Sequence, residues 1–127
     1  MAPPSPLPTY VYKIIPSAPP SPIPESYPLS DLDRQDGFVH LSTSWQVPIT
    51  SSLFFADFIS FHILKIRAAN FPPDSIKWDE VEGANGGCPH LYGNFGARDV
   101  VDSKEFVRRA DEGQTWKQVF EGETWLE

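Results

Sequence analysis

The residues of this chain best suited to chemistry are histidines in short segments of alternating character. In DGFVHLST, residues 36–43, the period-two geometry of a strand puts Phe38, His40 and Ser42 on one face. A histidine flanked by an aromatic ring and a hydroxyl group can exchange one hydrogen bond with a ligand. The alternative is a buried histidine bonded to a backbone carbonyl, and the strand pattern alone leaves both interpretations open.

A second segment repeats this arrangement. In CPHLYG, residues 88–93, His90 and Tyr92 share one face and Leu91 points the other way. A hydrophobic core seldom accommodates two such polar faces. If the two strands are neighbours in a sheet, we expect them to line one polar crevice that holds a small molecule.

A third segment, KWDEVEG at residues 77–83, combines an aromatic ring with charges of both signs. Trp78 offers a flat surface for a nucleobase or another ring, and Lys77 can meet a phosphate. Asp79 or Glu80 can stabilise a developing cation or act as a general base. The alternative is a strand with Trp78 in the core and the charged groups in water.

Metal and thiol chemistry are disfavoured by spacing. His40, His62 and His90 are enough for a three-ligand zinc site, but none of them are four residues apart as on a ligating helix, so we expect no metal. Cys88 lies two residues before His90, a placement that seldom joins a nucleophile to its base. As the single cysteine, Cys88 also excludes an internal disulfide.

Composition excludes other classes of protein. The chain has 127 residues, 40% of them hydrophobic, which fits one domain with a real core. The formal net charge of −7 argues against nucleic acid as a partner, since a phosphate backbone requires a basic surface. Asp57 and Lys65 interrupt the longest apolar run, so no membrane partner is expected, and the first ten residues lack the features of a signal peptide. We therefore expect a cytoplasmic protein that is a monomer or a weak homodimer.

Prolines divide the chain into an arm and a domain. Most of the 14 prolines fall within residues 1–28, where they exclude helix interiors and central strands. We expect a proline-rich arm over residues 1–8 and a single domain over residues 9–127.

The predicted fold class is α+β, a small and mostly antiparallel β domain with two or three short helices. Ser30 is placed to cap a helix that starts at Asp31 and ends at Gly37, and Pro48 must lie near the start of a second helix if one forms. The patterns predict strands over residues 9–15, 38–42, 60–68, 75–81 and 90–93, a loop over residues 82–89, and a strand or hairpin within residues 97–109.

Several of these motifs recur in one known family. YKI at residues 12–14, DGFVHLST, Gln46, the acid after Lys77 and Trp78, and PHLYG stand here in an order and spacing that resemble the domain of unknown function 952 family, which consists of small, mostly bacterial and fungal proteins. The resemblance covers about residues 10 to 103.

The resemblance implies an ADP-ribosyltransferase-like fold, whose members bind NAD in a cleft between two small sheets. By this resemblance His40 and Ser42 contact the ribose next to adenine, Tyr92 is similar to the aromatic residue that stacks on the nicotinamide side, and Asp79 or Glu80 supports the ribosyl cation. The candidate catalytic residues are thus His40, Asp79 and Glu80, and the candidate cofactor-binding residues are His40, Ser42, Thr43, Trp78, His90 and Tyr92.

Two hypotheses follow. The first is an enzyme that uses NAD, either transferring ADP-ribose or cleaving NAD by hydrolysis, for which one carboxylate near the anomeric carbon suffices. The second is a non-catalytic module that binds a small molecule or a nucleotide. A third possibility is an interaction domain that acts through its proline-rich arm. A diphosphate ligand also requires cationic groups, and those available are Lys13, Arg34, Lys65, Arg67 and Lys77.

Overall fold

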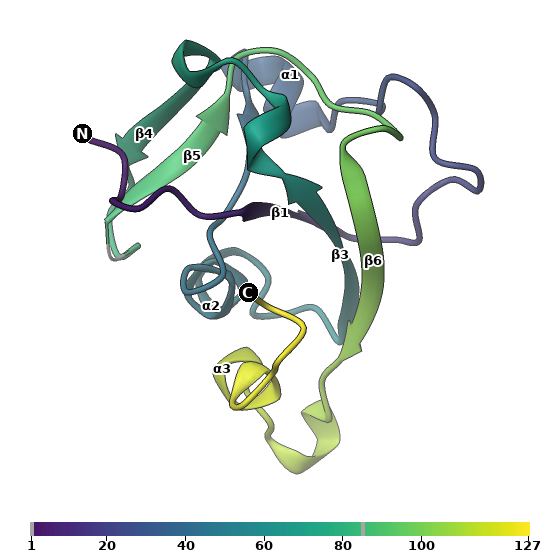
Figure 1. Cartoon of the computed structure of the whole chain (residues 1–127). Helices are drawn as coiled ribbons and strands as arrows, with labels where there is room; N and C mark the ends of the chain where they lie inside the picture. Colours follow the sequence, from purple (N-terminus) through teal and green to yellow (C-terminus); the bar gives the residue numbers. More distant parts are fainter. Residues whose placement is uncertain (1, 85) are drawn as a thin grey trace.

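The computed structural model describes residues 2–84 and 86–127 and contains two three-stranded antiparallel sheets (Figure 1). The large sheet has the order β1–β3–β6 and the small sheet the order β2–β5–β4. The α+β architecture with antiparallel sheets and few helices is therefore as predicted. The strands are β1 (Tyr10–Ile15), β2 (Val39–His40), β3 (Ser60–Arg67), β4 (Ile76–Glu80), β5 (Gly87–Leu91) and β6 (Val100–Val107); the helices are α1 (Asp31–Asp36), α2 (Val47–Phe54) and α3 (Trp116–Phe120), with single 3₁₀ turns at Ala68–Asn70, Pro73–Ser75 and Ala110–Glu112.

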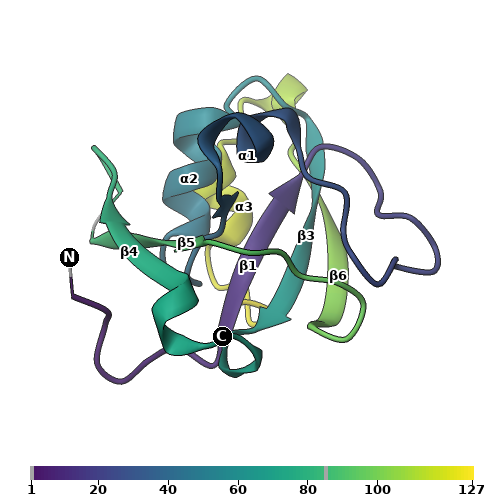
Figure 2. The same cartoon turned by 90° about the horizontal axis from the view of Figure 1, so that it is seen from above.

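The large sheet is covered on both faces, which explains why consecutive residues of its central strand β3, from Ile63 to Ile66, are buried. On one face Tyr12, Phe61 and Ile63 pack against α2 and α3, which lie together beside the sheet (Figure 2). The side chains of the other face, including Val11 and Leu64, pack against the inner face of the small sheet. The small sheet therefore has one buried face and one face left for other contacts.

The two sheets are joined where β2 ends. Its expected span of residues 38–42 is reduced to Val39–His40, because the chain turns after His40 and pairs with the large sheet instead. The backbone N–H of Tyr12 donates to the Ser42 carbonyl at 2.8 Å, and the N–H of Ser42 donates to the Tyr12 carbonyl at 2.9 Å. This bridge fixes the edge of the small sheet against β1.

Local signals for α1 and α2 are confirmed. The Ser30 side chain accepts from the N–H of Asp33, and Gly37 ends α1 with a φ of 80°, a conformation that suits glycine. Pro48 stands in the first turn of α2, where its missing N–H costs nothing.

Two boundaries differ from the prediction. The loop expected over residues 82–89 ends earlier, because β5 begins at Gly87 and runs through Pro89 to Leu91. Pro89 has no N–H to donate, but its carbonyl accepts from Leu41 at 3.1 Å, so pairing with β2 continues through it. Within residues 97–109, where a strand or a hairpin was expected, the structure has the single strand β6.

The C-terminal segment adds a helix that the sequence patterns did not indicate. α3 begins with a capping box formed by Thr115 and Gln118. After it, the chain returns to β1, where the Tyr12 hydroxyl accepts from the N–H of Glu127 at 2.7 Å. This segment closes the apolar layer on the outer face of the large sheet.

The proline-rich segment is ordered by a few contacts. Tyr27 stacks on Phe95 with ring centroids 5.0 Å apart, and its N–H donates to the Phe95 carbonyl at 2.8 Å. Residues 2–8 contain neither helix nor strand, and their separation as an arm stays a prediction. In the part of the chain that the structure describes, no helix has the length and apolar character needed to cross a membrane.

Gly96 provides a test of how closely the proline-rich segment packs on the domain. A Cβ at Gly96 would overlap the backbone carbonyl of Glu25, whereas a Cβ at Gly113 would meet open space and only the strain of a φ of 72°. We expect Gly96→Ala to lower the free energy of unfolding by about 3 kcal/mol and Gly113→Ala by about 1 kcal/mol. Urea denaturation of both variants checks this, and equal losses would contradict the close approach.

Candidate functional site

One row of residues crosses the small sheet through both histidine motifs. The Cα partner of His90 in β5 is His40 in β2 on one side and Lys77 in β4 on the other. Strand alternation puts Asp79 on the same face as Lys77, because the two are two positions apart in the strand. With the aromatic residues beside them, these side chains form what is called here the two-histidine face: Phe38, His40, Lys77, Asp79, His90 and Tyr92.

The two imidazole rings lie next to each other, so the two motifs do meet in space. Their centroids are 5.3 Å apart in an edge-on arrangement. Phe38 packs against both, at 4.6 Å from the His40 ring and 4.2 Å from the His90 ring, and it lies 5.2 Å from Tyr92. The face is therefore a packed aromatic and imidazole surface, and Phe38 occupies space expected to be an open crevice.

A buried carboxylate from α1 holds His40. Nδ1 of His40 lies 2.6 Å from Oδ1 of Asp33, which also accepts from the backbone N–H of His40 at 3.2 Å. The other oxygen of Asp33 accepts from Nζ of Lys13 at 2.7 Å, and Lys13 also donates to the His40 carbonyl at 3.2 Å. Asp33 is 3% exposed, so every charge in this group depends on its partners.

The charge states of this group follow from its contacts. Burial by itself would raise the pKa of Asp33, but the hydrogen bond from His40 and the ammonium of Lys13 outweigh it and lower that pKa to about 2. Burial lowers the pKa of Lys13, and the Asp33 carboxylate acts in the opposite direction. Because the two groups are 2.7 Å apart, we treat them as an ion pair.

A second carboxylate faces the other nitrogen of His40. Nε2 lies 2.9 Å from Oδ2 of Asp36, the last residue of α1, whose side chain is 35% exposed. A carboxylate offers acceptors only, so both contacts of His40 are hydrogen bonds when both ring nitrogens carry a proton. The geometry therefore fits an imidazolium between two aspartates.

His90 has a different environment. Its Nδ1 lies 2.8 Å from Oδ2 of Asp79, and its side chain is only 8% exposed. Burial lowers the pKa of His90, the hydrogen bond to Asp79 opposes this, and the neighbouring His40 lowers it further. Nε2 of His90 has no hydrogen-bond partner within residues 2–84 and 86–127. It is not among the fully buried polar atoms of these residues, so it reaches solvent.

Several residues expected at the site lie elsewhere. Ser42 is 4% exposed and its hydroxyl lies 3.1 Å from that of Thr50, because the chain turns inward after β2. Thr43 is fully buried, and Trp78 lies in the interior at 8% exposure. Glu80 is exposed at the end of β4, so Asp79 is the acid that meets a histidine.

The structure also places the third histidine and the cysteine. His62 lies in the large sheet between Ile15 and Glu105, away from the other two histidines. Cys88 is buried opposite Asp79, and both burial and this carboxylate raise the pKa of its thiol, which disfavours a thiolate nucleophile. Within residues 2–84 and 86–127, no group of three histidine, cysteine or acidic side chains has an arrangement that could hold a metal ion.

Among the basic residues, Lys77 is the one placed for a ligand of the face. Its Nζ lies 4.8 Å from the centre of the Tyr92 ring, and the residue is exposed. Lys13 is buried at Asp33, and Lys65 is bound to Glu127 at 2.5 Å. Arg34 pairs with Asp31, and Arg67 lies over Tyr10.

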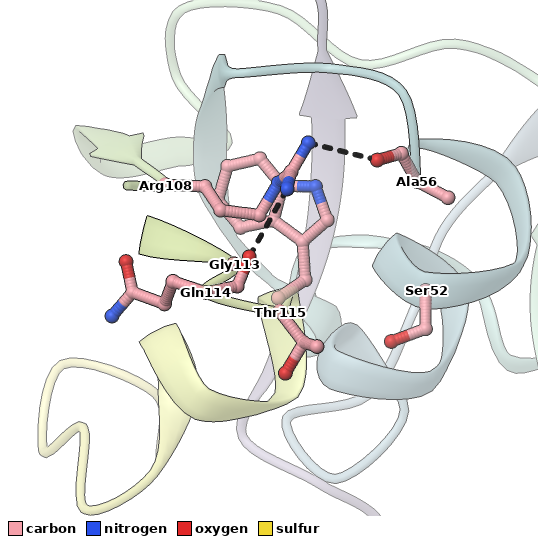
Figure 3. Close-up of a pocket in the computed structure, with 7 residues that line it drawn as sticks. Ser52, Ala56, Arg108, Gly113, Gln114 and Thr115 are labelled. Carbon is pink, nitrogen blue, oxygen red and sulfur yellow. Dashed lines mark hydrogen bonds between the residues drawn. The ribbon is translucent and has the colours of Figure 1, made fainter. Parts of the chain in front are cut away.

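A cavity of about 240 Å³ lies apart from this face, between α2 and the start of α3 (Figure 3). Arg108 donates there to the carbonyls of Ala56, Phe58 and Gln114 at 2.9 to 3.1 Å. Its guanidinium is thus used in hydrogen bonds to backbone carbonyls, and we assign Arg108 a structural role. A second cavity, of about 530 Å³, lies at Glu25, Ala97 and Arg98.

The sequence reasoning missed the two aspartates that contact His40. Asp36 stands four residues before His40, and α1 carries three aspartates in the segment that leads to this histidine. Such a run of acids next to a histidine was the available signal. From the sequence, this run was assigned only to a short capped helix that ends at Gly37.

The Asp33 contacts predict an acid-dependent loss of stability. Since the pKa of Asp33 is lowered in the folded state, its contribution is present above its usual pKa of 3.8 and disappears as the pH falls through about 2. The difference between these two pKa values corresponds to about 2 kcal/mol in the free energy of unfolding. We expect Asp33→Asn to destabilise the protein at pH 7 by about 2 to 4 kcal/mol, because Lys13 loses its partner.

Urea unfolding at pH 7, 4, 3 and 2.5 measures this. The difference in the free energy of unfolding between the wild type and Asp33→Asn should become smaller below pH 4. Asp31→Asn removes an exposed carboxylate from the same helix and should have little effect on this free energy. A constant gap at all pH values would contradict the assignment.

The comparisons agree with this fold. A family model with the description "Protein of unknown function (DUF952)" matches residues 22–103. The crystal structure of protein CC0527 from Caulobacter crescentus is 26% identical, with 81% of this chain and 90% of that chain covered and a TM-score of 0.68. The solution NMR structure of the same protein is 23% identical, with 92% and 98% covered and a TM-score of 0.65, a likeness of fold. No curated protein matches the chain. The chain therefore belongs to the DUF952 family, as its histidine motifs indicated.

Proposed function

We propose that the two-histidine face binds a nucleotide, and that this nucleotide is NAD. The observation that carries the proposal is the row His40–His90–Lys77 across the small sheet, with exposed Tyr92 beside Lys77. Tyr92 is 42% exposed and can stack on a base or on the nicotinamide ring. The imidazoles can bond to ribose hydroxyls, and Lys77 can pair with a phosphate.

The ADP-ribosyltransferase-like fold implied by the sequence resemblance is part of this proposal. The two adjoining antiparallel sheets support it, and NAD would lie along the small sheet near its junction with the large one. Ser42 has its hydroxyl on Thr50, so the proposal assigns the ribose contact to His40 without it. A ligand at Nε2 of His40 takes the place of Asp36, whose exposed side chain is free to turn into solvent.

For turnover, the proposal assigns the acid to Asp79. Its side chain is 43% exposed, and one oxygen is bonded to His90. A carboxylate there can stabilise the oxocarbenium-like state in which the bond between ribose and nicotinamide breaks. Water then completes a hydrolysis, or another acceptor completes a transfer of ADP-ribose.

A non-catalytic nucleotide-binding module is the second candidate, because one observation favours it. Phe38 packs against both imidazoles, so the face is shallow and excludes little water from a reacting bond. Binding by such a surface needs aromatic and cationic contacts but no acid.

Calorimetry tests the binding. NAD and ADP-ribose should bind the wild type, and Lys77→Ala should weaken both by about threefold to tenfold through loss of one charged contact. Free nicotinamide, which has no phosphate, should be insensitive to this change. Lys117→Ala, which removes an exposed lysine from α3, is the matched control. Equal affinities in the two variants would contradict a phosphate contact at Lys77.

The acid distinguishes the two candidates. If the protein cleaves NAD at the nicotinamide bond, Asp79→Asn should abolish nicotinamide release while calorimetric binding is retained, because only the cation-stabilising group is lost. Glu80→Gln, the exposed neighbour in β4, should behave as the wild type. Chromatography of nicotinamide measures the reaction, and binding without release in the wild type would support the module.

A further inference from the structure

We propose that His40 and His90 act as a general acid and a general base on a phosphate group that has two ester or anhydride bonds. One P–O bond of the bound nucleotide is then hydrolysed. This inference rests on the proposed nucleotide binding, but it assigns a reaction different from cleavage at nicotinamide. The diphosphate of NAD and a nucleoside 2′,3′-cyclic phosphate share this chemistry.

Each of the two histidines is oriented by an aspartate through Nδ1. His40 is held by Asp33 at 2.6 Å and His90 by Asp79 at 2.8 Å. Such a contact fixes the tautomer and directs Nε2 to the reacting group. Two imidazoles fixed in this way, with ring centroids 5.3 Å apart, can both reach one phosphate.

The environments of the two histidines favour opposite protonation states. His40 lies between the carboxylates of Asp33 and Asp36, a geometry that is satisfied when both nitrogens carry protons. His90 is buried under Phe38, which favours the neutral ring, and its Nε2 has no partner among the described residues. A pair of titratable groups with diverging environments is the usual arrangement of an acid and its base.

Groups that can hold a phosphate lie next to the two histidines. Asp36 now accepts from Nε2 of His40 with an exposed carboxylate, and a phosphate oxygen can take over that hydrogen bond. Lys77, the cross-strand partner of His90, supplies a positive charge at the same face. Asp36 thus competes with an anionic substrate for His40.

The step balances as follows. Nε2 of His90 takes a proton from a water molecule, whose oxygen forms a bond to phosphorus. The P–O bond to the leaving oxygen breaks, and that oxygen takes the proton from Nε2 of His40. His90 then releases its added proton to solvent and His40 takes a proton from solvent, so both histidines return to their starting states and water is the only co-reactant.

The charged groups around the pair set its pH dependence. His40 is faced by Asp33 and Asp36 from α1, by Lys13 from β1 through Asp33, and by His90. His90 is faced by Asp79 and Lys77 from β4, by Asp36 from α1 and by His40, with Cys88 on its own strand. Because one histidine must be protonated and the other neutral, we expect a bell-shaped dependence of the rate on pH.

The experiment uses the full chain with two substrates, adenosine 2′,3′-cyclic phosphate and NAD, and separates the products by chromatography. The expected products are adenosine monophosphate from the first, and adenosine monophosphate with nicotinamide mononucleotide from the second. His40→Asn and His90→Asn should each lower the rate by about 100-fold or more. His62→Asn, in the large sheet, is the matched control and should leave the rate unchanged.

A second variant guards against misfolding of His90→Asn, since that residue is buried. Asp36→Asn leaves Asp33 in place and should lower KM several-fold, because the competing charge is removed. An unchanged KM would contradict the assigned position of the phosphate.

The outcomes separate this inference from the proposed function. If NAD binds by calorimetry but neither substrate loses a P–O bond, the acid–base pair is wrong and the binding stands. If no nucleotide binds and none is cleaved, both are wrong. Equal loss of rate in His62→Asn and His40→Asn would also overturn the inference.

Discussion

The arrangement of the candidate site depends on one buried carboxylate. Asp33 bonds to the ammonium of Lys13 in the large sheet and to both the ring and the backbone of His40 in the small sheet. It thereby ties α1, β1 and β2 together at a point where burial would otherwise penalise each charge. The orientation of His40 follows from it. The contact of His40 with the ring of His90 follows in turn, because the two residues are direct cross-strand partners.

The layers of the fold explain why this face is available. The inner side of the small sheet is used by the core that it shares with the large sheet, and α2 and α3 cover the opposite side of the large sheet. On the outer side of the small sheet, Asp33 of α1 contacts His40 and Phe38 packs on His90. Polar side chains that a core would reject can therefore gather there with exposed Tyr92 and Lys77.

Much of this could be predicted from local sequence signals, and the failures have physical causes. Ser30 and Gly37 mark α1 because caps are local, and the alternation around His40 and His90 identified the strands that meet. The inward turn at Ser42 could not be predicted, since it depends on a backbone bridge to Tyr12, 30 positions away in the chain. The burial of Asp33 likewise depends on Lys13, and no periodicity reveals a partner that the fold supplies.

NMR mapping of NAD on the labelled protein tests the central claim most directly. The account predicts saturable shifts of the backbone amides of residues 38–40, 77–79 and 90–92 and of the ring signals of His40 and His90, with little change at the Arg108 cavity. Shifts confined to the Arg108 cavity, or no saturable shifts at all, would contradict a nucleotide site on the two-histidine face.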